Sequence, residues 1–381
     1  MNDITIDKTG WKKWRFDEVC RQVNTSSKDP VADGLDHVIG LEHIEPGNLH
    51  ITKWDTLEKE TTFTRKFVKG QVLFGRRRAY QRKVAYAEFD GICSGDILVF
   101  EAIEANLLPE LLPFLIQSDG FFEKALATSA GSLSPRTKFK ELADYEFLLP
   151  PKSEQKRLAE LLWAADEMIE KEKKELKNIT ICKNICFERN LNGANKKKLI
   201  ECCTVPPQYG SSSASSPYIE EKSRYVRITD IDDYGNLLTE EIVSPLNFSD
   251  LFLLKENDFL IARTGNTVGK SYLHKEKNGL FSFAGYLIRF RTDESILLPD
   301  YLMAFTKTFL FEDFKRKTIK VGAQPNINAE QYSMMEIPIL PINKQYNLIQ
   351  QIEKYNANYK SIVSQMLMSK QLKQELINKI F

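Results

Sequence analysis

Two long stretches of the chain repeat apolar residues at the spacing of one helical face and contain neither glycine nor proline. The first runs from Lys152 to about Arg189, and its apolar positions are Leu158, Leu161, Ala165, Met168, Leu176 and Ile179. The second runs from Asn343 to Phe381, and its apolar positions are Ile349, Ile352, Tyr359, Ile362 and Met366. Because an α-helix rises about 1.5 Å per residue, the pattern predicts two helices of about 55–60 Å each.

The narrow apolar stripes of these two stretches indicate how the helices are buried. Helices of this length rarely remain single in water. The stripes therefore favour pairing of the two helices with each other as an antiparallel coiled coil. Two independent surface helices are the alternative that the pattern leaves open.

Short runs of strand character precede each long helix. They lie at Gln71–Phe74, Ile97–Phe100, Phe259–Ile261 and Tyr286–Phe290, and short helical segments lie among them. Because strands and helices do not alternate regularly, the pattern predicts an α+β fold and not a regular βαβ series.

The two halves of the chain repeat one another at an offset of about 190 residues. LLPE at 107–110 is matched by LLPD at 297–300, Phe121 by Phe311, and Thr128 by Thr318. A repeat of this length is a whole domain with its connector, so we expect two similar globular domains separated by the helices, with internal pseudo-twofold symmetry. The predicted boundaries are 1–150 for the first domain, 151–193 for the central helix, 194–341 for the second domain and 342–381 for the C-terminal helix.

The bulk composition neither requires nor excludes a nucleic-acid partner. The chain has 381 residues with 28% charged, yet its formal net charge is only +1. Any affinity for anions must therefore come from local patches. The six cysteines form no CxxC pair, which disfavours a zinc site. The N-terminus lacks the apolar core of a signal peptide, and no run of about 18 apolar residues predicts a membrane span, so we expect a cytoplasmic protein.

Several segments approach catalytic motifs without meeting their requirements. GNTVGKS at 265–271 has one residue too few between its glycines for a phosphate-binding loop. Asp300 and Asp313 fit a loose nuclease spacing, but a single helix carrying both would place them roughly 20 Å apart. No glycine-rich loop after a strand indicates an S-adenosylmethionine site. Three histidines of the first half have a spacing that leaves a metal role open but disfavoured: His37, His43 and His50.

The segment from Thr61 to Ala87 holds eight basic residues and no acidic one, in a chain whose charges otherwise balance. Such a segment is typical of a DNA phosphate track with arginines available for guanine edges. A solvated charged face is the alternative. The candidate DNA-binding residues here are Arg76, Arg77, Arg78, Tyr80, Arg82 and Lys83.

Three further loops carry candidate DNA-binding residues. ARTGNTVGKSY at 262–272 is the less basic counterpart of the basic segment and offers Arg263, Thr264, Asn266, Lys270 and Tyr272. Two loops that follow a helix at a glycine offer short polar groups, namely Ser132, Ser134, Arg136, Thr137 and Lys138 in the first half and Gln324, Asn326 and Asn328 in the second. Asn and Gln pair with adenine, and Arg pairs with guanine. Plain turns are equally compatible with the chemistry of these loops.

Four segments carry a resemblance to a known family. They are FGRRRAYQRKVAYAEFDGICSGDILVF at 74–100, LLPPKSEQKRLAELL at 148–162, ARTGNTVGK at 262–270 and GAQPNINAEQYSMMEIPILP at 322–341. In their order, and in the doubled junction before each helix, they resemble the specificity subunit of type I restriction–modification systems. One departure from the doubled junction is Ile342 in the place of Pro151.

The resemblance implies a function without catalysis in this chain. Each domain would be a target recognition domain that reads one half of a bipartite site in double-stranded DNA, and the helix pair would set the spacer between the halves. Two methyltransferase subunits would dock on the chain and carry S-adenosylmethionine, this chain holding no cofactor and no metal of its own, and motor-nuclease subunits would complete the complex. A scaffold without DNA reading and a fused nuclease or nucleotide-dependent enzyme are the rival hypotheses.

Overall fold

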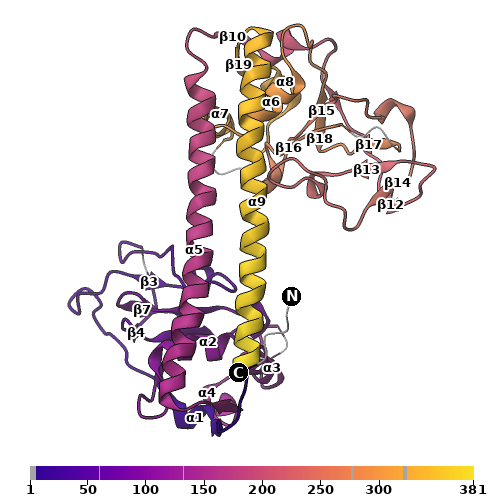
Figure 1. Cartoon of the computed structure of the whole chain (residues 1–381). Helices are drawn as coiled ribbons and strands as arrows, with labels where there is room; N and C mark the ends of the chain where they lie inside the picture. The colour runs from indigo at the N-terminus through magenta and orange to yellow at the C-terminus, as the bar shows by residue number, and fades with distance from the viewer. Residues whose placement is uncertain (1–5, 60, 132, 276–278, 321–323) are drawn as a thin grey trace. The chain divides into compact units, whose positions relative to one another are not determined.

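The computed structural model describes residues 6–59, 61–131, 133–275, 279–320 and 324–381. The chain forms two compact units, and each includes a part of both long helices (Figure 1). Unit 1 comprises Met1–Lys173 and Val363–Phe381, and unit 2 comprises Lys174–Ile362.

Unit 1 combines small sheets with short helices. Its strands are β1 (Lys12–Arg15), β2 (Cys20–Val23), β3 (Val38–Ile39), β4 (Arg65–Phe67), β5 (Val72–Gly75), β6 (Val84–Tyr86), β7 (Gly91–Cys93), β8 (Ile97–Ala102) and β9 (Glu146–Leu149). Its short α-helices are α1 (Phe16–Val19), α2 (Leu112–Gln117), α3 (Asp119–Ala127) and α4 (Phe139–Leu142). The strands form an antiparallel sheet in the order β2-β8-β5-β6, a second sheet in the order β3-β7-β4, and the pair β1-β9.

Unit 2 is built from a similar set of elements. Its strands are β10 (Asn195–Lys198), β11 (Gln208–Tyr209), β12 (Ser215–Pro217), β13 (Arg224–Val226), β14 (Val243–Pro245), β15 (Phe259–Ala262), β16 (Ser271–Leu273), β17 (Phe281–Phe283), β18 (Leu287–Phe290) and β19 (Glu336–Ile339). Its short α-helices are α6 (Pro299–Phe305), α7 (Phe309–Thr318) and α8 (Ala329–Ser333). The predicted α+β mixture and the predicted strands are confirmed.

The strand pairing of unit 2 follows that of unit 1. The order β11-β18-β15-β16 corresponds to β2-β8-β5-β6, and the antiparallel pair β10-β19 corresponds to β1-β9. The parallel pair β13-β17 likewise corresponds to β3-β7. The two halves therefore share a topology as well as a sequence pattern.

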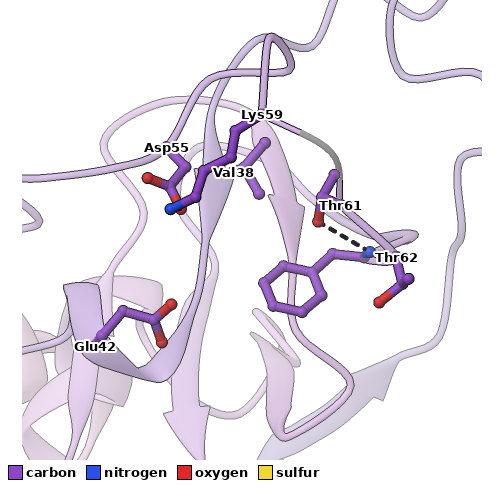
Figure 2. Close-up of a pocket in the computed structure, with 7 residues that line it drawn as sticks. Val38, Glu42, Asp55, Lys59, Thr61 and Thr62 are labelled. Atoms are coloured by element: carbon purple, nitrogen blue, oxygen red, sulfur yellow. Dashed lines mark hydrogen bonds and ion pairs between the residues drawn. The ribbon is translucent and has the colours of Figure 1, made fainter. Parts of the chain in front are cut away.

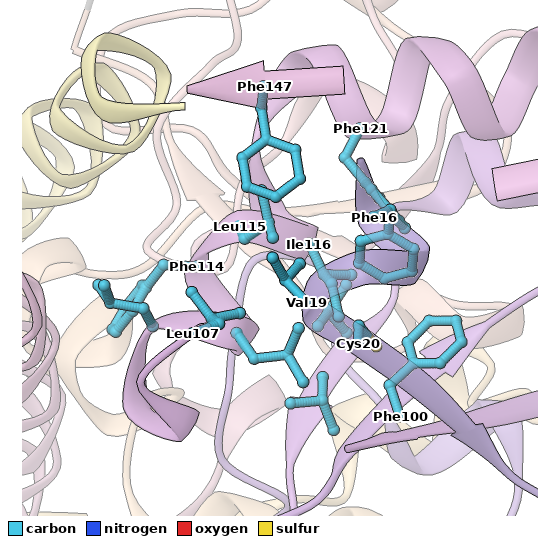
Figure 3. Packing of buried hydrophobic residues seen from close by; sticks show 14 of the residues in the cluster. Phe16, Val19, Cys20, Phe100, Leu107, Phe114, Leu115, Ile116, Phe121 and Phe147 are labelled. Atoms are coloured by element: carbon cyan, nitrogen blue, oxygen red, sulfur yellow. The ribbon is translucent and has the colours of Figure 1, made fainter. Parts of the chain in front are cut away.

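The main core of unit 1 lies between the β2-β8-β5-β6 sheet and the short helices. Phe16, Phe100 and Phe121 are fully buried there, and Figure 3 shows them in the same cluster as Leu115 and Ile116 of α2. Phe16 packs edge-on against Phe100 with ring centroids 5.5 Å apart. Each aromatic side chain of this size buries about 150–250 Å², so these rings contribute strongly to the core.

Both predicted long helices are present, as α5 (Lys152–Arg189) and α9 (Ile342–Ile380). Along α9 one series of partly or fully buried positions recurs at alternating spacings of three and four residues, as a coiled-coil stripe requires. The series comprises Gln345, Leu348, Ile352, Tyr355, Tyr359, Ile362, Met366, Ser369, Lys373, Leu376 and Ile380, and other partly or fully buried positions such as Ile349, Val363 and Ile377 lie beside it. The stripe predicted for α5 was wrong at Leu161 and Met168, which are exposed, because the buried face of α5 also carries polar residues such as Asp166 and Asn184.

The two long helices contact each other within each unit. In unit 1, Lys373 Nζ donates to Asp166 Oδ1 (2.7 Å) and Ser369 Oγ donates to Glu172 Oε1 (3.0 Å). In unit 2, Lys183 Nζ donates to Asn356 Oδ1 (3.4 Å). In unit 1, contacts farther along α5 fall earlier along α9, so the two segments run in opposite directions there.

The junction before each long helix is held by one buried glutamine. Gln155 accepts from the Leu108 amide (2.8 Å) and donates to the Pro150 carbonyl (3.1 Å). Gln345 accepts from the Leu298 amide (2.9 Å) and donates to the Leu340 carbonyl (2.8 Å).

These bonds correct the alignment of the two junctions. The backbone amide of Gln155 donates to the Pro151 carbonyl, and the backbone amide of Gln345 donates to the Pro341 carbonyl, both at 3.0 Å. Pro151 therefore corresponds to Pro341 and not to Ile342, and the residue that departs from the doubled proline is Leu340, at the place of Pro150.

One asparagine of a long helix caps a short helix in each unit. Asn378 of α9 accepts from the Asp119 amide that opens α3 (2.9 Å), and Asn184 of α5 accepts from the Phe309 amide that opens α7 (2.8 Å). Each contact satisfies a helix N-terminal amide that has no partner within its own helix. Among the described residues, we find no helix with both the length and the apolar character to cross a membrane.

Candidate nucleic-acid interface

The two loops of unit 1 that carry candidate residues lie against each other. The Arg78 amide donates to the Pro135 carbonyl (2.8 Å), and the Thr137 amide donates to the Arg76 carbonyl (3.1 Å). Between these bonds Arg77 and Arg136 face each other in an antiparallel bridge. Because the contact is made by backbone groups, it does not use the guanidinium groups of Arg77 and Arg136, and both remain partly exposed.

Asp96 is the carboxylate that organises these arginines. It accepts from Arg136 Nε (2.7 Å) and Nη2 (3.2 Å), and from Arg77 Nη1 (3.4 Å). Arg77 Nη2 also donates to Ser134 Oγ (3.0 Å). The pKa of Asp96 lies below its ordinary value, chiefly because of the hydrogen bond from Arg136, so the carboxylate remains ionised.

Positive charge exceeds negative charge around Asp96. Arg65 donates to the Ile97 carbonyl nearby, and the charges of Arg65 and Arg136 both act on Arg76. Burial, followed by repulsion from Arg65, lowers the pKa of Arg76. The buried Nε groups of Arg76 and Arg77 have no partner among the described residues. Four guanidinium groups around one carboxylate make a site that favours an additional anion.

The arginine turn is closed in a conformation that L-residues rarely adopt. Arg78 has φ +54°, and the corresponding residue in unit 2 is Gly265 with φ +67°. A residue with a side chain costs about 1 kcal/mol or more in this region compared with glycine. Such strain is found most often at functional sites, and exposed Tyr80 lies directly after this turn.

Some of the predicted DNA-binding residues of unit 1 have side chains that already bond other residues of the same unit. Thr137 is fully buried and hydrogen-bonded to Thr128, so a direct contact with DNA is not supported for it. Arg82 pairs with Asp119 and stacks over Phe122, and Lys83 donates to the Leu41 carbonyl (2.6 Å). Lys138 is exposed. Ser132 lies outside the described residues.

Unit 2 brings its two candidate loops together in the same way. The Gly265 amide donates to the Pro325 carbonyl, and the Ile327 amide donates to the Arg263 carbonyl, both at 2.9 Å. Thr264 and Asn326 face each other in the bridge, at the places of Arg77 and Arg136.

Different side chains surround this second bridge. The Arg263 amide donates to the Tyr286 carbonyl (3.0 Å), as the Arg76 amide donates to the Asp96 carbonyl (3.0 Å), so Tyr286 takes the place of Asp96. The Arg263 guanidinium lies 5.1 Å from the Tyr209 ring and 5.7 Å from the Tyr286 ring. Both rings are partly exposed, and such cation–π contacts orient an arginine without neutralising it.

Of the other predicted DNA-binding residues of unit 2, some are exposed, and others are buried or bonded to residues of the same unit. Asn266, Gln324 and Asn326 are exposed. Tyr272 is buried, which argues against its predicted contact with DNA, because strand β16 is buried on both faces. Lys270 pairs with Asp233 (2.8 Å), and the Asn328 side chain caps α8 by accepting from the Gln331 amide (2.8 Å).

Three residues of the two sites were missed in the sequence. Asp96, Tyr209 and Tyr286 organise the arginines but lie far from them along the chain. A signal existed for Asp96 and Tyr286, since Asp96 directly precedes the predicted strand run Ile97–Phe100 and Tyr286 begins the run Tyr286–Phe290. Each of these strands pairs with the strand that leads into the arginine-bearing loop of its unit. Tyr209 carries no comparable signal.

The near-matches to catalytic motifs do not form catalytic sites among the described residues. Gly265–Thr267 is a short 3₁₀ turn that leads into strand β16, whereas a phosphate-binding loop leads into an α-helix. Asp300 and Asp313 lie on two separate helices, α6 and α7, and not on one. Each has its own cationic partner, Lys275 for Asp300 and Lys317 for Asp313.

The three histidines that we considered as metal ligands have separate surroundings. His37 stacks on Phe89 with ring centroids 4.2 Å apart, and His50 contacts Asp166 and Glu88. His43 Nδ1 accepts from the Gly40 amide (2.9 Å). The structure therefore does not bring the three side chains together.

A pocket of unit 1 is lined by Glu42, Asp55 and Lys59, among other residues (Figure 2). The potential ligand atoms of Glu42 and Asp55 lie within 4.8 Å of one another and of a ring nitrogen of His43, and Lys59 pairs with Asp55 at 2.9 Å. Since His43 Nδ1 accepts a hydrogen bond, the neutral imidazole carries its proton on Nε2 and has no lone pair for a metal there. Asp55 is likewise engaged by Lys59, so this arrangement fits an ion-pair network.

Comparisons with known proteins agree with this architecture. A family model described as "Type I restriction modification DNA specificity domain" matches residues 8–180. The curated specificity subunit of the type I restriction enzyme EcoDI from Escherichia coli is 26% identical over 167 residues, which are 42% of this chain and 37% of that protein. The aligned region thus spans little more than a third of that relative.

Two solved structures resemble the chain along nearly its whole length. One, described as "Structural basis underlying complex assembly and conformational transition of the type I R-M system", has a TM-score of 0.58 at 19% identity and covers 98% of this chain and 97% of that chain. The type I restriction–modification S subunit from M. genitalium has a TM-score of 0.55 at 14% identity, covering 99% of this chain and 98% of that chain. These likenesses show the fold, and the resemblance predicted from the sequence is confirmed.

Proposed function

We propose that this chain, whose residues 8–180 belong to the type I restriction modification DNA specificity domain family, is the specificity subunit of a type I restriction–modification complex. Unit 1 would read one half of a bipartite DNA target, and unit 2 would read the other half. The subunit would itself catalyse nothing.

The observation that carries the proposal is the paired loop at the tip of β5 and of β15. Both units build it with equivalent backbone hydrogen bonds, and both expose polar and cationic side chains from it. The side chains at corresponding places differ: Arg77 and Arg136 in one unit, Thr264 and Asn326 in the other. A common frame with different exposed groups is what two readers of different short sequences require.

We assign the spacer between the two half-sites to α5 and α9. The regular three-four stripe of α9 and the antiparallel contacts in unit 1 support a coiled coil formed by these helices. A stiff spacer would fix the distance between the two readers, since half-sites on one face of the duplex must lie about one helical turn, 34–36 Å, or a multiple of it apart.

The long helices also carry the surface that we assign to methyltransferase subunits. Several large apolar side chains on them are exposed, namely Leu161, Met168, Ile181 and Ile185 on α5 and Tyr346, Leu367, Met368 and Leu372 on α9. Exposed apolar groups in such number are typical of protein interfaces. The methyltransferase partners would bring S-adenosylmethionine, and motor-nuclease subunits would complete the complex.

The DNA-reading role is tested by removing the arginine cluster. We expect R76A/R77A/R78A to bind duplex DNA more weakly. The slope of the logarithm of its binding constant against the logarithm of the salt concentration should fall by the equivalent of up to about three phosphate contacts. The control is K196A/K197A/K198A, which removes the same charge from strand β10, outside both loops. Equal effects of the two triple variants, or no effect of either, would refute the assignment and leave a scaffold without DNA reading.

The same proposal is tested in the cell by mapping adenine methylation with and without the chain. A split methylated motif that disappears when the chain is deleted supports a bipartite reader. Methylation that is unchanged by the deletion contradicts it.

A further inference from the structure

Residue 136 and residue 326 occupy the same place in the two paired loops, yet they have different chemistry. Each follows the proline whose carbonyl closes its loop, and each faces the other loop in an antiparallel bridge. The Arg136 guanidinium is hydrogen-bonded to the Asp96 carboxylate. Asn326 is exposed, and the neighbouring loop carries Arg263, whose guanidinium lies over the Tyr286 ring. The comparison identifies the position at which the two units can differ in what they read.

The hold on Arg136 leaves one defined edge of its guanidinium free. Asp96 takes the Nε proton and one Nη2 proton, on the side of the fork nearest the chain. The opposite edge, formed by Nη1 and the second Nη2 proton, has no partner among the described residues. Two parallel donors on a planar edge match the O6 and N7 acceptors of guanine in the major groove.

This arrangement is better suited to a base than to a phosphate. A phosphate contact needs only a cation within reach, and the neighbouring Arg76 and Arg77 already supply charge. A carboxylate partner cancels one charge and fixes the plane of the Arg136 guanidinium, which weakens a phosphate contact but favours a planar base edge. The side chains of both partners remain partly accessible, at 41% for Arg136 and 19% for Asp96.

We propose that Arg136, held by Asp96, reads a guanine in the half-site of unit 1, and that Asn326 reads an adenine at the corresponding place in the half-site of unit 2. The inference rests on the proposed function and adds the bases to it. An asparagine side chain offers one donor and one acceptor, which match N7 and N6 of adenine. Asp96 is then a positioning residue, since it acts through Arg136.

The position of Tyr286 explains why unit 2 does not use an arginine here. Tyr286 takes the place of Asp96 and presents a ring to Arg263 instead of a carboxylate to residue 326. An arginine at 326 would therefore lack the bidentate partner that orients Arg136. A substitution that transfers the guanine preference must change both residues, as N326R/Y286D.

The experiment is selection of binding sites from a randomised duplex DNA library by the full chain, followed by competition with single-base variants of the selected site. We expect R136K, which keeps the charge but not the fork, to lose discrimination at one G·C pair by roughly 5- to 150-fold. Its salt dependence should equal that of the wild type. D96N should lose the same discrimination while binding random DNA more tightly, because it removes a negative charge.

The opposite half-site supplies an independent arm of the test. N326R/Y286D should replace a preferred A·T pair with G·C in the unit 2 half-site and leave the unit 1 half-site unchanged. Far-ultraviolet circular dichroism, together with retained selection of the untouched half-site, shows that each variant is folded.

The outcomes separate this inference from the proposed function. A selected bipartite motif whose preferences are unchanged in R136K and in N326R/Y286D overturns the assignment of bases and leaves the proposed function standing. A wild-type chain that selects no motif overturns both. A D96N variant that loses affinity for random DNA and for the site alike shows a merely structural role for Asp96 and overturns its positioning role.

Discussion

The buried ion network of unit 1 allows the strongest prediction about stability. Asp166 of α5 and Lys373 of α9 are 3% and 4% exposed, and their ion pair is 2.7 Å long. His50, from the segment between β3 and β4, donates to Asp166 Oδ2 (2.8 Å), and its other ring nitrogen contacts Glu88 (3.0 Å). The network thus joins the globular part of unit 1 to both long helices.

Removing one member of this network should cost far more than removing a surface charge. Breaking a buried ion pair from one side costs about 3–5 kcal/mol, because the remaining charge stays buried. For K373M we expect the lower end, about 3 kcal/mol, since His50 still partners Asp166. D166L should cost a similar amount, and the double variant should cost about 2–3 kcal/mol less than the sum of the two. K370M, at an exposed lysine one turn earlier on α9, is the control and should change stability by less than about 0.5 kcal/mol.

The assay uses the distribution of tryptophan in the chain. All four tryptophans lie in unit 1, at positions 11, 14, 54 and 163, and the Trp163 ring centroid is 6.4 Å from that of His50. Denaturation followed by tryptophan fluorescence therefore reports on unit 1 alone, while circular dichroism reports on both units. Additive effects of K373M and D166L, or a K373M cost no larger than that of K370M, would refute the reasoning.

The same network predicts how the stability of unit 1 depends on pH. Both ring nitrogens of His50 face carboxylates, and its hydrogen bond to Asp166 is the largest cause that raises its pKa to about 9. A pKa raised on folding contributes stability that is fully present below the unfolded value of about 6.5 and is lost as the pH rises through about 9. The contribution is at most about 3 kcal/mol. The fluorescence-detected free energy of unfolding should therefore fall between about pH 6 and about pH 10 by more in the wild type than in H50N.

Two further predictions concern the arginine turn and the helix surface. R78G should raise the free energy of unfolding of unit 1 by about 0.5–1 kcal/mol, because glycine adopts φ +54° without strain, and it should weaken DNA binding; a loss of stability in denaturation would contradict the strain argument. L161E/M168E should abolish co-purification of a methyltransferase subunit while leaving the melting temperature of the isolated chain unchanged, and retained co-purification would place the docking surface elsewhere.

Much of the helical architecture could be predicted because it depends on a periodic pattern. The stripe of α9 was recognisable from Ile352, Tyr359 and Ile362, and both helices have nearly the predicted bounds. The stripe of α5 was recognisable at Leu158 and Leu176 but was wrong at Leu161 and Met168, because the polar residues Asp166 and Asn184 occupy buried positions where the pattern calls for apolar ones. A buried polar residue is compatible with a core only when it has partners, and those partners are distant in sequence.

The candidate interface was only partly predictable for a similar reason. The run of basic residues identified the loop that holds Arg77, and residue type identified Arg136 as a candidate. Neither signal could show that Arg77 and Arg136 share the Asp96 carboxylate. A local sequence pattern also could not predict which of these side chains are exposed. Thr137 and Tyr272 belong to segments that read as polar loops, and yet both side chains are buried. The missing information was the pairing of β5 with β8, which brings the turn before β8, with Asp96, into contact with the loop after β5.

The way in which the paired loops are built separates stability from recognition. The loops are joined through backbone amides and carbonyls, and the segments that lead to α5 and α9 are fixed by the buried Gln155 and Gln345. Neither set of bonds uses the side chains at 136 and 326, so those positions can change without loss of the frame that presents them. Substitutions at the glutamines should instead leave buried amides and carbonyls without partners, at about 1–3 kcal/mol for each group. A fold that places its variable residues where the backbone alone maintains the structure can change what it reads without first becoming unstable.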